Sequence, residues 1–134
     1  MRKIIISGCC GHMGRVVANI CNDDPEVEIA AGIDLLAQPM EGFPVFSTPA
    51  ACTVEADAVI DFSHPAALGP LLEFCVSKKL PVVLATTGYS EEQLAQITEA
   101  AQSIPVFRSA NMPLGINVLT DLVRRAAALL GEDF

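Results

Sequence analysis

Residues 3–14 read Lys3-Ile4-Ile5-Ile6-Ser7-Gly8-Cys9-Cys10-Gly11-His12-Met13-Gly14. The three isoleucines form a short β-branched run that is typical of a buried strand, and Gly8 ends this run. After the glycines, apolar residues recur at helical spacing, at Met13, Val16, Val17, Ile20 and Cys21. The stretch therefore predicts a strand, a tight turn and a sheet-packed helix in immediate succession.

Each glycine of this turn suits a role that a larger residue fills poorly. Gly8 lets the chain turn sharply off the strand, Gly11 lets backbone N–H groups approach a pyrophosphate, and Gly14 permits close helix–strand packing. The helix N-terminus adds the positive end of its dipole. The spacing is GxxGxxG rather than the commoner GxGxxG, so a purely structural turn is the alternative. With its strand and helix, the turn predicts a dinucleotide site.

The composition favours one α/β domain spanning residues 1–134. Hydrophobic residues make up 51% of the chain and aromatic residues 5%, with no Trp, which suits an aliphatic core between helices and a parallel sheet. The net charge is −8 and no basic cluster exceeds a pair, which opposes nucleic acid as a partner. No apolar stretch approaches the length of a membrane span or a signal segment, so we expect a soluble, cytoplasmic protein without a membrane partner.

The five cysteines stand at positions 9, 10, 21, 52 and 75, with no CxxC pair and no histidine cluster. This pattern predicts neither a disulfide framework nor a metal site. Cys21 and Cys75 fall on apolar helical positions, where a free thiol behaves as a small hydrophobe. Cys9 and Cys10 lie inside the glycine turn, where we expect small residues filling a crowded space; a reactive thiol near the phosphates is the alternative.

Strand and helix patterns alternate along the rest of the chain. We expect strands at 27–33, 44–47, 57–62, 80–85 and 104–107 and helices beginning near Pro70, at the Ser90/Gln93 capping box and at Leu114, the last of them ending at Leu130 before Gly131. Such alternation produces parallel βαβ units with right-handed crossovers. The predicted fold is an α/β, Rossmann-like, doubly wound and mainly parallel sheet with helices on both faces.

Asp34 ends the second expected strand, twenty residues beyond Gly14. An acid at this place accepts hydrogen bonds from an adenosine ribose in dinucleotide sites. The alternative is an aspartate that merely caps the following turn. In a parallel sheet, ligand groups gather at the carboxyl ends of the strands. We therefore expect the turns at 8–13, 34, 62–64, 85–88 and 109–112 to surround one crevice.

Together these turns resemble the 4-hydroxy-tetrahydrodipicolinate reductase family, formerly the dihydrodipicolinate reductases, of lysine and diaminopimelate biosynthesis. The likeness covers nearly the whole chain. It is carried by Gly8-x-x-Gly11-x-Met13-Gly14-Arg15, Asp61-Phe62-Ser63-x-Pro65, Thr86-Thr87-Gly88-Tyr89 and Asn111-x-x-Leu114-Gly115-Ile116-Asn117. The resemblance implies the NAD(P)H-binding part of an oxidoreductase that transfers hydride to a cyclic imine dicarboxylate.

The resemblance also implies a role for individual residues. The pyrophosphate would be held by Gly8, Cys9, Cys10, Gly11, His12 and Met13. Asp34 would bind the adenosine ribose, with Phe62 in the same crevice, and His64 would stack on the adenine; an exposed loop histidine is the alternative. The nicotinamide end would be lined by Ala85, Thr86 and Thr87 and contacted by Ser109, Ala110, Asn111 and Met112.

Two departures from the family pattern affect the cofactor. Ala85 replaces a usual glycine, and Met112-Pro113 replace a common Phe-Ser pair, so the nicotinamide contacts should differ slightly. Leu35 follows Asp34 where NADPH-using members often carry a basic residue, and no Lys or Arg occurs between Asp34 and Lys78. A 2′-phosphate would meet a carboxylate without a compensating cation. We therefore expect NADH to be preferred, with NADPH possible.

The third departure concerns the end of the sequence at Phe134. Family enzymes continue into a substrate domain that carries a His-His pair, an Arg and a Lys. We expect no catalytic acid–base residue in this chain, a small dicarboxylate substrate bound through the missing domain, and a truncated or isolated domain that is inactive alone. The resemblance implies a full-length homotetramer and a fragment that is a monomer or weak dimer.

Two other functions stay open at this point. The first is a stand-alone, non-enzymatic NAD-sensing or regulatory domain. The second is a different two-domain oxidoreductase that shares only the fold, against which the Thr86-Thr87-Gly88 and 111–117 turns argue.

Overall fold

The computed structural model describes residues 2–38, 40, 42–86 and 88–108. The elements are β1 (Arg2–Ser7), α1 (His12–Asp23), β2 (Val27–Ile33), β3 (Val45–Phe46), β4 (Ala58–Asp61), α2 (Leu68–Lys78), β5 (Val82–Leu84), α3 (Glu91–Ala100) and β6 (Val106–Arg108). Two short 3-10 helices, Pro49–Ala51 and Pro65–Ala67, precede β4 and α2. The helix expected at 114–130 lies outside the described residues. None of the described helices combines the length and the hydrophobicity of a membrane-spanning segment.

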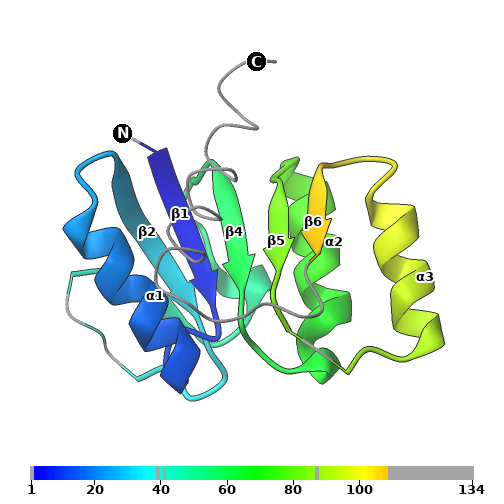
Figure 1. Cartoon of the computed structure of the whole chain (residues 1–134), viewed down its shortest axis with the longest axis horizontal. Coiled ribbons are helices and arrows are strands. Elements are labelled where there is room, and N and C mark those ends of the chain that lie inside the picture. The colour runs from blue at the N-terminus through cyan, green and yellow to red at the C-terminus, as the bar shows by residue number, and fades with distance from the viewer. Residues whose placement is uncertain (1, 39, 41, 87, 109–134) are drawn as a thin grey trace.

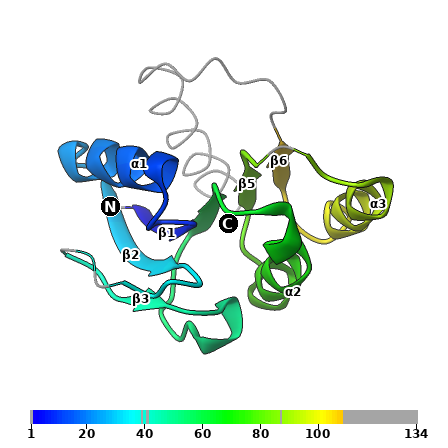
Figure 2. The same cartoon turned by 90° about the horizontal axis from the view of Figure 1, so that it is seen from below.

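One sheet of six strands carries the domain, in the order β3-β2-β1-β4-β5-β6. Every neighbouring pair of strands is parallel. Helix α1 covers one face, and α2 and α3 lie on the other (Figures 1 and 2). The chain runs outward from β1 in one direction through β2 and β3, and in the other through β4 to β6. The predicted Rossmann-like fold is confirmed, and a switch point lies between β1 and β4, where such sheets bind ligands.

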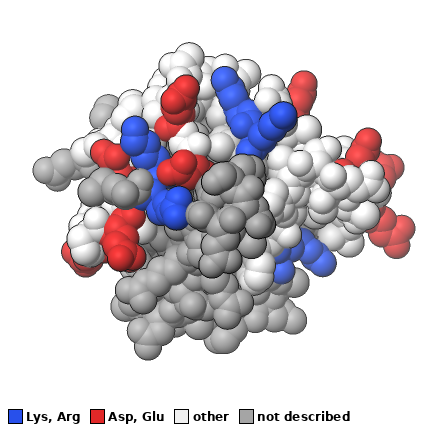
Figure 3. Space-filling model, turned by 90° about the horizontal axis from the view of Figure 1, so that it is seen from above, with Lys and Arg blue, Asp and Glu red and all other residues white. Residues whose placement is uncertain are grey.

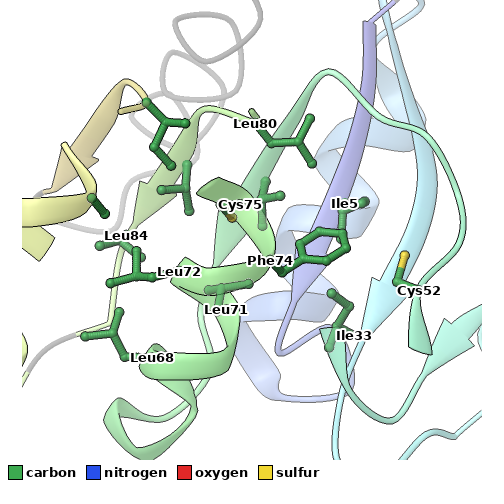
Figure 4. Packing of buried hydrophobic residues seen from close by; sticks show 14 of the residues in the cluster. Ile5, Ile33, Cys52, Leu68, Leu71, Leu72, Phe74, Cys75, Leu80 and Leu84 are labelled. Carbon is green, nitrogen blue, oxygen red and sulfur yellow. The ribbon is translucent and has the colours of Figure 1, made fainter. Parts of the chain in front are cut away.

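The isoleucines of β1 pack against the helices on both faces of the sheet. Ile4 and Ile6 pack in the cluster that contains Val17 of α1, whereas Ile5 packs in the cluster built around α2. Figure 4 shows Ile5 near Phe74 and the leucines of α2. All three isoleucines are fully buried. Since burial of such a side chain contributes about 2–3 kcal/mol, this run anchors the glycine turn that follows it.

Two strands begin later than the apolar pattern indicates, because a proline precedes each. Pro81 and Pro105 lack an N–H group and cannot donate to the ladder. Their carbonyls do accept, from Val59 at 2.9 Å and from Val82 at 3.1 Å. The expected strands at 80–85 and 104–107 therefore become Val82–Leu84 and Val106–Arg108.

The helix starts follow their local sequence signals. Helix α2 begins at Leu68, two residues before the expected start, and Pro70 occupies its first turn, where an N–H group has no partner within the helix. The capping box of α3 is confirmed: Ser90 Oγ accepts the Gln93 N–H at 3.2 Å and Gln93 Oε1 accepts the Ser90 N–H at 2.9 Å.

The helical cysteines are buried thiols. Cys21 is 1% exposed on α1 and Cys75 is 0% exposed on α2. Burial raises the pKa of each thiol to about 12, so both are neutral at physiological pH. The prediction that they act as small hydrophobes is confirmed.

Candidate functional site

Steric constraints explain two glycines of the turn after β1. Gly8 has a φ of +83°, and a Cβ on it would lie 2.7 Å from the carbonyl carbon and oxygen of Phe62. A Cβ on Gly14 would lie 2.1 Å from the carbonyl oxygen of Gly8. A Cβ on Gly11 would meet nothing closer than 3.5 Å. The fold itself therefore requires Gly8 and Gly14, whereas Gly11 is left exposed at the rim of the turn.

The N-terminus of α1 has the properties of an anion-binding helix end. Gly11 is its N-cap and makes no side-chain cap, and the first turn holds no acidic residue. Helix α3 differs, because its first N–H groups are satisfied by a capping box and Glu91 and Glu92 lie in its first turn. Among the described residues, no side chain caps this helix end, so its leading N–H groups and the positive end of its dipole can receive an anionic ligand.

Asp34 connects the end of β2 to the glycine turn. Its Oδ2 accepts the backbone N–H of Cys10 at 3.0 Å, and its Oδ1 accepts the backbone N–H of Leu36 at 3.0 Å. The turn-capping contact is therefore present, together with a second contact that crosses between strands. Each carboxylate oxygen can accept more than one hydrogen bond, so capping leaves room for ribose hydroxyls.

A cavity of about 540 Å³ opens beside these groups, at the carboxyl ends of the strands. Its size suits a nucleoside. Two apolar side chains on its lining, Leu35 and Leu36, are 83% and 67% exposed. The sequence-predicted residues that line it are Gly8, Gly11, Asp34, Phe62 and His64.

His64 lines this cavity from an exposed position at the start of a 3-10 helix. Its Nδ1 accepts the backbone N–H of Ala66 at 3.1 Å and caps Pro65–Ala67. The histidine thus has a local structural role, and its stacking on an adenine stays a prediction.

The two cysteines of the turn are packed inside it. Cys9 is 0% exposed and Cys10 is 8% exposed, with their sulfur atoms 4.0 Å apart. Burial, followed by the neighbouring Cys10, raises the pKa of the Cys9 thiol to about 12. Both sulfur atoms and a carboxylate oxygen of Asp34 lie within 4.8 Å of one another, a set that could ligate a soft cation. Since Cys9 is neutral and fully buried, we interpret the set as packing.

Arg15 lies beside the turn without a role assigned from the sequence. Its Nε donates to the carbonyl oxygen of Cys10 at 3.1 Å. The peptide groups of Cys10 therefore link this exposed guanidinium to Asp34. The position of Arg15 directly after Gly14 was the available sequence signal.

Asp61 is the second residue that sequence reasoning missed. It ends β4, is 1% exposed, and its Oδ1 accepts both the backbone N–H and the hydroxyl of Ser63, at 3.0 and 2.5 Å. The hydroxyl of Thr86, just after β5, lies 3.2 Å from its Oδ2. Burial raises the pKa of Asp61, while hydrogen bonds from Ser63, Ser7 and Thr86 lower it. An acid at the end of a buried strand was the sequence signal.

Tyr89 approaches the same carboxylate. Burial, and then the charge of Asp61, raise the pKa of its hydroxyl to about 12, while Thr86 and Arg108 lower it. The carboxyl ends of β1, β4 and β5 therefore share one polar cluster, which we define as Ser7, Asp61, Ser63, Thr86 and Tyr89.

The remaining predicted residues divide into two groups. His12 and Met13 begin α1, and Ala85 follows β5 with its N–H bonded to the carbonyl oxygen of Asp61 at 3.0 Å. The others lie outside the described residues: Thr87, Ser109, Ala110, Asn111 and Met112.

Known proteins resemble this chain in sequence and in structure. A sequence model of the family described as "Dihydrodipicolinate reductase, N-terminus" matches residues 2–112. The 4-hydroxy-tetrahydrodipicolinate reductase of Caldanaerobacter subterraneus subsp. tengcongensis is 50% identical over 130 residues, covering 97% of this chain and 51% of that protein. The protein of the same name from Clostridium tetani is 44% identical over 134 residues, covering 100% and 52%. This chain thus spans about half the length of these relatives.

Solved structures share the fold of this chain. Dipicolinate-bound dihydrodipicolinate reductase from Paenisporosarcina sp. TG-14 superposes with a TM-score of 0.65 at 24% identity, covering 75% of this chain and 43% of that one. At this identity the likeness concerns the fold alone.

Proposed function

This chain belongs to the dihydrodipicolinate reductase family, and from that premise we propose that it is the nucleotide-binding half of an NAD(P)H-dependent reductase. One observation carries the proposal. The Gly8 turn, the uncapped N-terminus of α1 and Asp34 meet at the switch point of the sheet, beside a cavity of nucleoside size. Phosphates, ribose and base each find the chemistry that binds them there.

We propose that the pyrophosphate lies on the turn formed by residues 8–13 and the adenosine ribose on Asp34. The adenine would enter the cavity between Leu36 and His64. The nicotinamide end would lie toward Ala85 and Thr86, together with the predicted residues beyond 108. Two observations support this assignment: no described side chain caps the N-terminus of α1, and each Asp34 carboxylate oxygen accepts a backbone hydrogen bond and can accept another.

We propose NADH as the preferred cofactor, with NADPH accepted more weakly. A 2′-phosphate would add negative charge beside the Asp34 carboxylate, and the neighbouring Leu35 and Leu36 offer no compensation. Arg15, whose Nε donates to the carbonyl oxygen of Cys10, is a nearby cation that would reduce this repulsion.

When bound, the cofactor supplies the hydride, and the residues of this chain bind and orient it. We assign substrate binding and protonation of a cyclic imine dicarboxylate to the half of the relatives that this chain does not match. We likewise propose that a homotetramer forms through that half in a cytoplasmic enzyme, that this chain is a monomer or weak dimer, and that it is inactive alone. A stand-alone regulatory domain is not favoured, since the matched relatives are named reductases.

The net charge of −8 supports a small-molecule ligand rather than nucleic acid. Figure 3 looks onto the face at the amino ends of the strands, where the described Lys and Arg side chains alternate with Asp and Glu. On this face, the described residues form no continuous basic area of the kind that follows a phosphate backbone.

Calorimetric titration of this chain with NADH and NADPH tests the proposal. Asp34→Ala should weaken NADH more than NADPH, because it removes a ribose acceptor and also removes the repulsion of a 2′-phosphate. Asp24→Ala, at the C-terminal end of α1, is the control and should leave both affinities unchanged. Absence of binding by the unaltered chain would refute the function; equal losses in Asp34→Ala would reduce Asp34 to a turn cap.

A further inference from the structure

Asp61 is a buried carboxylate whose described partners are all neutral. It is 1% exposed, and its hydrogen bonds come from the Ser63 N–H and from the hydroxyl groups of Ser63, Thr86 and Ser7. No Lys, Arg or His within the described ranges forms an ion pair with it. Burying a carboxylate is costly unless an opposite charge is nearby. A ligand carrying positive charge would therefore find an electrostatic partner here.

The order of the strands places this carboxylate along the path of a bound dinucleotide. Asp34 follows β2, the glycine turn follows β1, Asp61 ends β4 and Thr86 follows β5, in neighbouring positions across the sheet. Neighbouring strands lie about 4.8 Å apart. If the pyrophosphate lies on the glycine turn and one ribose on Asp34, the second nucleotide extends over the ends of β4 and β5.

The backbone beside the glycine turn brings Asp61 close to that path. The Phe62–Ser63 peptide touches the turn so closely that Gly8 has no room for a Cβ, with Ser63 N only 2.8 Å from its ideal position. Asp61 holds this same peptide through the Ser63 N–H. The carboxylate is thus one residue removed from the surface that faces the proposed cofactor.

We propose that Asp61 acts as an electrostatic selector of the redox state of the cofactor, favouring an oxidised nicotinamide over a reduced one. The inference rests on the proposed function. An oxidised nicotinamide ring carries one positive charge, whereas the reduced ring carries none. Hydrogen bonds cannot make this distinction by themselves, but a buried negative charge does. A site that binds the oxidised form relatively better also makes hydride donation by the reduced form more favourable.

The test compares the affinities of this chain for NAD⁺ and NADH in the Asp61→Asn variant. Asparagine has nearly the same shape and keeps one oxygen to accept both Ser63 donors. We expect the affinity for NAD⁺ to fall roughly ten-fold, which is the order of effect of removing one unit charge in a medium of intermediate dielectric constant, and that for NADH to change less than about two-fold. Asp57→Asn, at the amino end of the same segment, is the matched control and should change neither.

The ratio of the two affinities distinguishes the loss of the Asp61 charge from a displacement of its neighbours. An equal loss for both nucleotides would overturn the proposal, because a merely misplaced Ser63 or Thr86 weakens both forms alike. Unchanged affinities would overturn it as well. If the unaltered chain binds neither nucleotide, the proposed function itself fails. Circular dichroism checks the fold, and Asp61→Ser, also neutral and hydrogen-bonding, replaces the Asn variant if that variant does not fold.

Discussion

Substitution of Gly11 and of Gly14 by alanine should separate ligand binding from folding. The two glycines are three residues apart, yet their surroundings differ sharply. A Cβ on Gly11 would lie 3.5 Å from the nearest atom, the carbonyl oxygen of Gly8, whereas a Cβ on Gly14 would lie 2.1 Å from that same oxygen. The first distance is an ordinary contact, and the second requires the backbone to move.

The structure sets the expected size of each effect. Gly11 is an N-cap residue whose φ of −76° suits alanine. Because alanine is a poorer N-cap than glycine, Gly11→Ala should lower the free energy of unfolding by only roughly 0.5–1 kcal/mol. Gly14→Ala gains up to about 1 kcal/mol of helix propensity but forces α1 away from the turn, at a cost of about 3 kcal/mol or more. We therefore expect a net loss of roughly 2 kcal/mol or more from Gly14→Ala. Urea unfolding followed by circular dichroism measures both values.

Nucleotide binding, unlike stability, should depend directly on Gly11. Gly11 lies on the exposed rim of the cavity, where an added methyl group would meet the incoming pyrophosphate. Gly11→Ala should weaken NADH at least about ten-fold, or 1.4 kcal/mol, in calorimetry while the protein stays folded. Normal NADH binding by Gly11→Ala would refute the placement of the pyrophosphate. Equal stability of the two variants would refute the packing argument for Gly14.

Three further predictions concern stability and reactivity. Burial raises the pKa of Asp61 above its usual 3.8, so the folded state binds the proton of this carboxyl more tightly than the unfolded state does. The unaltered protein should therefore gain stability relative to Asp61→Asn as the pH falls from 7 toward 4. Urea unfolding that shows the opposite trend would contradict this. With pKa values of about 12, the thiols of Cys9, Cys21 and Cys75 should react with a disulfide reagent only as fast as the protein unfolds, and rapid labelling of these sites by mass spectrometry would count against it. Gln93→Ala should lower the free energy of unfolding by about 1–2 kcal/mol, because it removes one half of the α3 capping box and the 2.6 Å hydrogen bond from Nε2 to the Pro65 carbonyl. Gln96→Ala on the same helix is the control and should be nearly neutral in thermal unfolding.

The local elements were predictable because their signals lie within a few residues of one another. The strand, glycine turn and helix of residues 2–23, the capping box at Ser90 and the thiols at helical positions all follow from neighbouring residues. Strand ends at Pro81 and Pro105 were displaced because a missing N–H group acts on the ladder with another strand, which periodicity along one chain does not report.

The candidate site was predictable in outline and incomplete in detail. Five predicted residues line one cavity, since parallel strands bring their carboxyl ends to one edge. Asp61 and Arg15 gained their roles only from contacts with Thr86 and Cys10. The structure also showed that Asp34 caps a turn and bonds Cys10 at the same time, a pair of contacts that the two sequence interpretations had treated as alternatives.

The alternation of strands and helices, the glycine turn and the family resemblance can all be read along the chain, because hydrophobic period, glycine conformation and helix capping act over short distances in sequence. The order of the strands, and with it the contacts between distant side chains, becomes visible in the folded chain: Cys10 meets Asp34 across 24 positions, and Asp61 meets Thr86 across 25. Those meetings depend on strand order and register, which arise from packing both faces of the sheet simultaneously. The buried charge of Asp61 exists as a feature only in that packed state.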